Sequence, residues 1–116
     1  MATRVLIVDD HPSFRTGVRR MLEAEGFEVV GEAADGESAL AATASLRPEL
    51  VLLDVSLPDL DGFEVTQRIV AAGGPPVVLT SSRDRADYGD CVDYCGARGF
   101  VQKADLSGSA LTALLA

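Results

Sequence analysis

Leu50-Val51-Leu52-Leu53-Asp54 is the stretch that decides the fold, because four consecutive apolar residues end on a carboxylate. A strand that is apolar at every position is typical of a parallel sheet covered on both faces by helices. Similar runs end on other polar residues: Val5-Leu6-Ile7-Val8 before Asp9 and Asp10, Val77-Val78-Leu79 before Thr80, and Phe100-Val101 shortly before Lys103. Open parallel sheets bind their ligands at the edge where the strands end.

Length and composition indicate one globular domain over residues 1–116. Hydrophobic residues make up 47% of the chain, which is enough for a buried core and argues against disorder. The formal net charge of −8 disfavours binding to nucleic acid or to an anionic membrane through the bulk surface. No apolar stretch approaches the roughly 18 residues that span a bilayer, and the first residues lack the layout of a signal peptide. We therefore expect a cytoplasmic protein with no membrane attachment.

Periodicity predicts five strands that alternate with five helices. The predicted strands are residues 4–8, 27–32, 50–54, 76–80 and 100–102. The first three predicted helices begin near Pro12, Asp35 and Asp61 and end near Gly26, Pro48 and Gly73. Two more are predicted over residues 84–95 and 107–116.

The predicted helix over residues 84–95 is the weakest of the five. It contains Gly89, Asp90 and Asp93, which are poor helix formers, so we expect it to be short, frayed or mobile. Cys91 and Cys95 lie four positions apart in it, where both would point along one face and pair poorly as a disulfide. We interpret them as reduced core residues.

The spacing of the polar strand ends predicts that they meet. Asp9 and Asp54 are separated by two strand–helix units, whereas Asp54 and Thr80, and then Thr80 and Lys103, are separated by one. Right-handed crossovers keep all these strands pointing the same way, so their ends converge.

A cluster of this composition is suited to phosphoryl chemistry. Two carboxylates about 4 Å apart repel by roughly 4 kcal/mol at an effective dielectric constant of 20, so three of them require a cation. Mg²⁺ prefers oxygen ligands, and Lys103 supplies a second positive charge. Asp54, at the end of the middle strand, is best placed to attack phosphorus and form an acyl phosphate.

In this arrangement the chain resembles the receiver domain of two-component response regulators nearly end to end. The matching residues are Asp9-Asp10, Asp54, Pro58 with Asp61-Gly62, Thr80-Ser81, and Phe100 three residues before Lys103. Two further stretches resemble the NarL/FixJ-type branch: Asp9-Asp10-His11-Pro12 with Arg15 and Gly17, and Val30-Gly31-Glu32-Ala33.

The resemblance implies an α/β, flavodoxin-like (CheY-like) fold, with a doubly wound parallel sheet of order 2-1-3-4-5 flanked by five helices. It implies that Asp54 accepts a phosphoryl group from a phosphohistidine on a sensor histidine kinase. Asp9, Asp10 and Asp54 would hold Mg²⁺, with the backbone carbonyl of Ser56 as a further ligand.

The resemblance also implies how the domain responds. Lys103 would contact the phosphate, and the hydroxyl of Thr80 would swing toward it while Phe100 moves inward. The surface of the fourth helix and fifth strand would change as a result. Ser56 and Ser82 match variable positions that tune the loss of phosphate by hydrolysis.

Some features set limits on the resemblance. Ala104, not proline, follows Lys103, so we expect no cis peptide bond there. The short final helix argues against a dimer built on it, although a homodimer stays open as an alternative. DNA would be bound only through an output domain that this sequence does not contain, and the chain is either a stand-alone receiver or part of a longer regulator.

The function that we expect is that of a signalling domain, which catalyses only its own phosphorylation and dephosphorylation. Two alternatives are a phosphatase and a protein-binding module. A phosphatase with an aspartyl nucleophile usually carries a second acid two residues later, and here Ser56 holds that position. A module that binds proteins independently of phosphorylation would not need the intact set of acids, threonine and lysine. His11 is interpreted as a loop residue.

Overall fold

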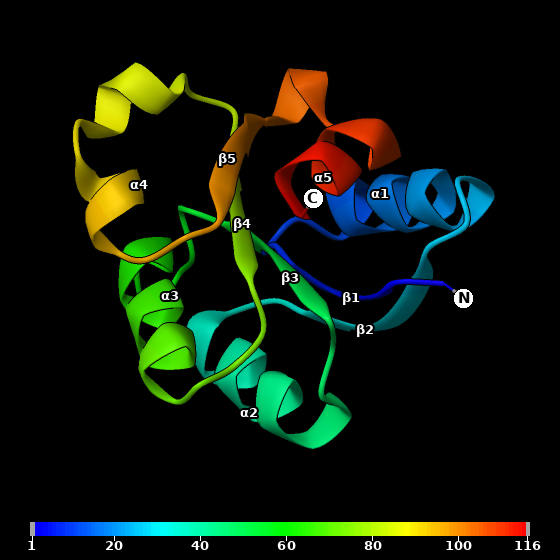
Figure 1. Cartoon of the computed structure of the whole chain (residues 1–116), viewed down its shortest axis with the longest axis horizontal. Coiled ribbons are helices and arrows are strands. Elements are labelled where there is room, and N and C mark those ends of the chain that lie inside the picture. The colour runs from blue at the N-terminus through cyan, green and yellow to red at the C-terminus, as the bar shows by residue number, and fades with distance from the viewer. Residues whose placement is uncertain (1, 116) are drawn as a thin grey trace.

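The computed structural model describes residues 2–115, which form a parallel sheet of five strands flanked by helices (Figure 1). The strand order is β2-β1-β3-β4-β5, as predicted, and the fold is the CheY-like flavodoxin fold. The strands are β1 (Arg4–Val8), β2 (Glu28–Ala33), β3 (Leu50–Asp54), β4 (Val77–Ser81) and β5 (Gly99–Gln102).

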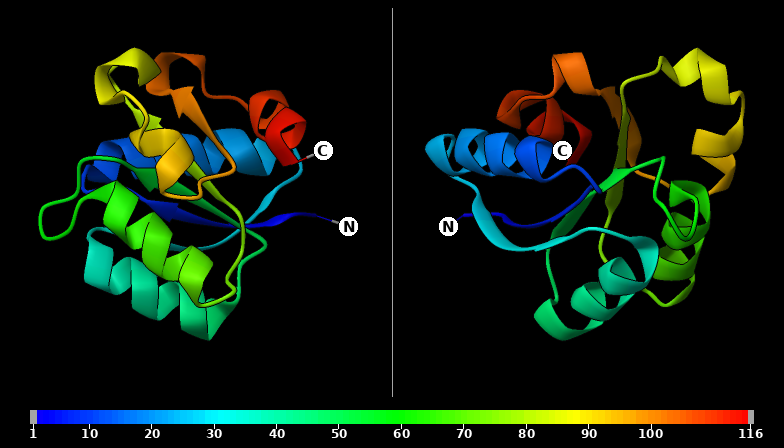
Figure 2. Two further views of the ribbon diagram at one scale, coloured as in Figure 1. Left: turned by 60° about the vertical axis from the view of Figure 1, so that its left-hand side comes forward. Right: turned by 180° about the vertical axis from the view of Figure 1, so that it is seen from behind.

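Helices cover both faces of the sheet (Figure 1 and Figure 2). They are α1 (Pro12–Ala24), α2 (Gly36–Leu46), α3 (Gly62–Ala71), α4 (Cys91–Tyr94) and α5 (Gly108–Leu115), with short 3₁₀ turns η1 (Arg85–Tyr88) and η2 (Lys103–Asp105). Successive side chains of a strand point to opposite faces. Val5 and Ile7 therefore join the core beneath α1 and α5, whereas Leu6 and Val8 join the core beneath α2, α3 and α4.

Several strand boundaries differ by one residue from the prediction, and backbone pairing explains the shifts. The N–H of Phe27 donates to the carbonyl of Leu22 in the last turns of α1, so Phe27 belongs to the end of that helix and β2 begins at Glu28. Pro76 has no N–H to contribute to the sheet, and β4 extends instead to Ser81, which pairs with Gln102. The final predicted helix is observed as α5, and residue 116 lies outside the described residues.

The region of the fourth predicted helix is short, as expected, and is divided in two. Gly89 has a left-handed φ of 57° and separates η1 from the single turn of α4. The interpretation of both cysteines as core residues is wrong for Cys91. The single turn of α4 buries only Val92, so Cys91 is exposed. Cys95, just after the turn, is buried beside Val92, and its thiol donates to the carbonyl of Val92.

The loop that follows β3 returns to the strand it left. The N–H of Gly62 donates to the carbonyl of Val55 at 2.8 Å. A Cβ atom on Gly62 would lie 2.6 Å from the carbonyl oxygen of Asp54 and 2.7 Å from the Cα of Val55. Both are backbone atoms, so a side chain here requires the strand end and the loop to move apart.

We expect Gly62→Ala to lower the free energy of unfolding by roughly 2 kcal/mol, because the added methyl overpacks a rigid contact. Gly17→Ala, inside α1, is the control, since a Cβ there meets no atom within 4 Å. That change should raise the free energy of unfolding by about 0.5–1 kcal/mol, because alanine is the better helix former. Urea denaturation measures both, and a Gly62→Ala variant as stable as wild type would contradict the packing argument.

Candidate functional site

Four strands deliver polar side chains to one edge of the sheet. Asp9 follows β1 and is fully buried, and Asp54 is the last residue of β3, with 3% of its surface exposed. Lys103 follows β5 and reaches both: its Nζ lies 2.7 Å from Asp9 Oδ2 and 3.3 Å from Asp54 Oδ2. Thr80 lies opposite Asp54 in the register of β3 and β4. The polar strand ends therefore converge, as their spacing predicts.

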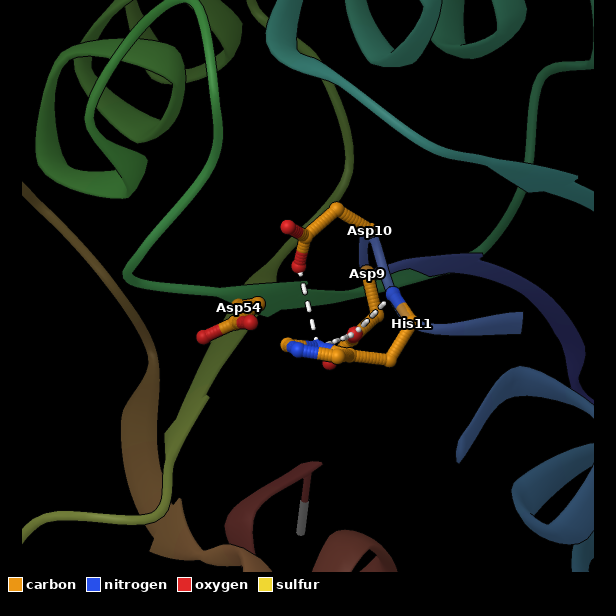
Figure 3. Close-up of side chains that lie close together, drawn as sticks. All are labelled: Asp9, Asp10, His11 and Asp54. Carbon is orange, nitrogen blue, oxygen red and sulfur yellow. Dashed lines mark hydrogen bonds and ion pairs between the residues drawn. The ribbon is translucent and has the colours of Figure 1, made fainter. Parts of the chain in front are cut away.

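Three carboxylates and an imidazole form a compact cluster (Figure 3). Asp9, Asp10, His11 and Asp54 each offer one candidate ligand atom, and these atoms all lie within 4.8 Å of one another. His11 Nδ1 lies 3.0 Å from a carboxylate oxygen of Asp9 and 3.0 Å from one of Asp10. His11 precedes α1, as expected for a loop residue, but its contact with both carboxylates was not predicted from the sequence. The only signal was its position directly after the two aspartates.

Thr80 is buried without a partner for its hydroxyl. Only 1% of the residue is exposed, and Oγ1 makes no hydrogen bond to any residue between 2 and 115. An unpaired buried hydroxyl costs roughly 1–3 kcal/mol, so this group is poised to donate to an incoming acceptor.

Comparison with known proteins identifies this arrangement. The family described as "Response regulator receiver domain" matches residues 5–115. The chain belongs to this family. Phosphorylation by a histidine kinase is the general function of receiver domains of response regulators.

Individual relatives place the receiver domain near the NarL/FixJ-type branch. It is 43% identical over 105 residues to the "virulence factors putative positive transcription regulator BvgA" of Bordetella pertussis, covering 89% of this chain and 50% of that protein. It is 46% identical over 102 residues to "response regulator GacA" of Pseudomonas viridiflava, covering 86% and 48%. The chain thus spans about half the length of these curated relatives.

A solved structure supports the same placement. The "signal receiver domain of the putative response regulator NarL from Mycobacterium tuberculosis" superposes with a TM-score of 0.88 at 33% sequence identity, covering 98% of this chain and 97% of that one. Between residues 2 and 115, the receiver domain has no helix of the length and apolarity that crossing a bilayer requires.

Burial and neighbouring charges shift the pKa values of the central groups of the receiver domain. Burial is the largest influence on Asp9, but hydrogen bonds from Lys103 and from the backbone N–H of His11 outweigh it and lower the pKa. The pKa of Asp54 is raised, because burial and the negative charge of Asp9 outweigh the hydrogen bond from Ser56 N–H and the positive charge of Lys103. Burial opposes the charge of Lys103, yet the two carboxylates raise its pKa.

The side chain of Tyr88 connects the ends of β4 and β5 to the region around α4. The ring of Tyr88 lies between Phe63 and Phe100, with centroid distances of 5.5 and 6.0 Å. Its hydroxyl lies 2.6 Å from the Oγ of Ser81, the residue after Thr80. The part of the sequence that was predicted to be a poor helix therefore contacts both the partly buried Phe100 and the end of β4.

The remaining predicted residues lie at the rim of the site. Ser56 is exposed, and its N–H donates to Asp54 Oδ1 at 3.1 Å. Ser82 is also exposed, and its carbonyl accepts from Gln102 Nε2 at 3.2 Å. No cis peptide bond occurs in residues 2–115, in agreement with the expectation for Lys103-Ala104.

We expect Asp54→Asn to stabilise the fold in EDTA. The raised pKa of Asp54 means that its ionisation destabilises the folded protein at neutral pH, and this cost vanishes below the pKa of the unfolded chain. At pH 7 the variant should therefore have a higher free energy of unfolding than wild type, with a smaller gain at lower pH.

Asp9→Asn is the matched control, because the lowered pKa of Asp9 predicts the opposite sign. The stabilisation from Asp9 is present above its unfolded pKa and is lost as pH falls through its folded pKa. Urea denaturation over a series of pH values measures both variants. Loss of stability in Asp54→Asn at neutral pH would show that the charge balance of the cluster is not as described.

Proposed function

We propose that Asp54 accepts a phosphoryl group from a phosphohistidine of a sensor histidine kinase. The observation that carries this proposal is the contact of Lys103 with two buried carboxylates at the end of neighbouring strands. In the transfer, a carboxylate oxygen of Asp54 would bond to phosphorus as the phosphorus–nitrogen bond to histidine breaks. Lys103 would face the negative charge of the transferred group, and the unpaired hydroxyl of Thr80 would donate to it.

The donor set at this edge fits Mg²⁺. Asp9, Asp10 and Asp54 would hold the ion, with the backbone carbonyl of Ser56 as a further ligand, and carboxylate and carbonyl oxygens are the ligands that Mg²⁺ takes in proteins. When bound, Mg²⁺ neutralises charge on the transferring phosphoryl group. The role of His11 would be to orient the carboxylates of Asp9 and Asp10, since nitrogen is a poor ligand for this ion.

The same transfer would switch the surface around β5. As Thr80 turns toward the phosphoryl group, Phe100 would move inward behind it, and the contacts of Tyr88 with Phe100 and Ser81 would carry this change to η1 and α4. Ser56 and Ser82, at the exposed rim, would set how quickly water removes the phosphate.

The domain would catalyse only its own phosphorylation and dephosphorylation. Ser56 stands where an aspartyl phosphatase carries its second acid, and no carboxylate replaces it in that position. We place this single domain, residues 1–116, in the cytoplasm with the kinase as its partner. DNA would be reached only through an output domain.

We predict that acetyl phosphate with Mg²⁺ adds one phosphoryl group to the wild-type protein and none to Asp54→Asn. Asp105→Asn is the control, because Asp105 is an exposed carboxylate two residues beyond Lys103 and should not affect labelling. Intact-mass spectrometry with and without EDTA gives the result. Equal labelling of wild type and Asp54→Asn would remove Asp54 as the acceptor, and steady turnover of a small phosphate ester would favour the phosphatase.

We predict that the switch changes the surroundings of Tyr88. The chain has two tyrosines and no tryptophan, so Tyr94→Phe leaves Tyr88 as the only strong fluorophore. Beryllofluoride with Mg²⁺, which imitates the phosphoryl group, should change the emission of this variant. The matched Tyr88→Phe variant reports only Tyr94, which is 80% exposed, and should change less. No change at Tyr88, while a raised melting temperature shows that beryllofluoride is bound, would contradict the switch.

A further inference from the structure

We propose that Asp59 is a positioning residue for phosphoryl transfer, which ties the tip of the loop after β3 to the first turn of α2. This inference rests on the proposed function, because the loop in question carries Ser56 beside the acceptor Asp54. The carboxylate of Asp59 makes no hydrogen bond to either residue, so its influence would pass through the backbone of the loop.

The carboxylate of Asp59 accepts three backbone hydrogen bonds. Oδ1 accepts from Gly36 N–H at 2.7 Å and from Leu60 N–H at 2.8 Å, and Oδ2 accepts from Glu37 N–H at 3.0 Å. Two of these donors are the first N–H groups of α2, which have no partner within the helix. A negative charge is also favoured at a helix N-terminus. The N–H of Gly36 is the main cause of a lowered pKa for Asp59, since its hydrogen bond favours the ionised carboxylate.

The helix does not depend on Asp59 for its cap. Asp35 already caps α2 from the adjacent position by accepting from Ser38 N–H at 2.8 Å. What Asp59 adds is a link between parts of the chain that are 23 residues apart. The link is tight, because a Cβ atom on Gly36 would lie only 2.9 Å from the Cβ of Leu60.

The loop is fixed at its ends independently of this link. Ser56 N–H bonds to Asp54 Oδ1, and Gly62 N–H bonds to the carbonyl of Val55. Between these anchors, the hydrogen bonds of Asp59 to Gly36 and Glu37 are the only ones, within residues 2–115, that join residues 56–60 to another helix. Removal of this carboxylate would leave the loop held to α2 only by the packing of Leu60, and the carbonyl of Ser56 would be held less firmly toward the metal site.

The test compares Asp59→Ala with Asp35→Ala, since each removes one carboxylate from the N-terminus of the same helix. The measured quantity is the Mg²⁺ concentration that gives half-maximal labelling by acetyl phosphate. We expect Asp59→Ala to need about tenfold more Mg²⁺, as is typical when support of a metal ligand is lost, and Asp35→Ala to match wild type. Both should lower the melting temperature by similar amounts.

Asp59→Asn provides a rescue that a general loss of stability would not give. Its amide oxygen can still accept from Gly36 and Leu60, whereas its NH₂ group cannot accept from Glu37. The Mg²⁺ requirement of this variant should fall between those of wild type and Asp59→Ala. An equal requirement in Asp59→Ala and Asp35→Ala would overturn the positioning role.

Calorimetric titration with Mg²⁺ alone separates this inference from the proposed function. It should give about tenfold weaker binding to Asp59→Ala than to Asp35→Ala, whether or not the protein is phosphorylated. Wild-type protein that is never labelled on Asp54 would refute the proposed function, and equal Mg²⁺ affinities of the two variants would refute the role of Asp59.

Discussion

The ion pairs of Lys103 with Asp9 and Asp54 are the interaction on which the site depends. Two buried carboxylates at the ends of adjacent strands repel each other, and the ammonium group lies 2.7 and 3.3 Å from their oxygens. The lysine follows β5, so the contact joins the ends of three strands that are distant in the sequence. The ammonium group does not offset the cost of both buried charges equally, because the pKa of Asp54 stays raised while that of Asp9 is lowered. A new cationic partner, or a modification of the carboxylate, would therefore stabilise the folded protein more at Asp54 than at Asp9.

The sheet makes this concentration of charge possible. All neighbouring strands run parallel, and β3, in the middle of the order, is buried along its whole length. Helices cover both of its faces, so a polar side chain on this strand can reach solvent only where the strand ends. The loop after β3 then returns to the strand end at Gly62 and contacts α2 through Asp59. The same few contacts, at Gly62 and Asp59, thus stabilise the fold and fix the geometry of the site.

Much of this arrangement could be predicted from the sequence, because it follows from local patterns. Apolar runs that end at Asp9, Asp54 and Thr80, at intervals of whole strand–helix units, are sufficient to predict a parallel sheet with a polar edge. Contacts set by tertiary structure could not be predicted: the hydrogen bonds of Asp59 cross 23 residues, and the place of Tyr88 depends on how an irregular segment packs. The exposure of Cys91 was missed for the same reason.

Asp9, Asp54 and Lys103 come from separate strand ends, and we expect them to lie around one bound cation. Paramagnetic broadening of amide NMR signals by Mn²⁺, used in place of Mg²⁺, tests it most directly. We expect strong broadening around Asp9, Asp54 and Lys103 at low Mn²⁺ concentration, reversed by excess Mg²⁺. Arg47 and Gly73, which precede β3 and β4 at the opposite edge of the sheet, should keep sharp signals. Broadening centred elsewhere on the surface, with the signals of those three residues unaffected, would contradict it.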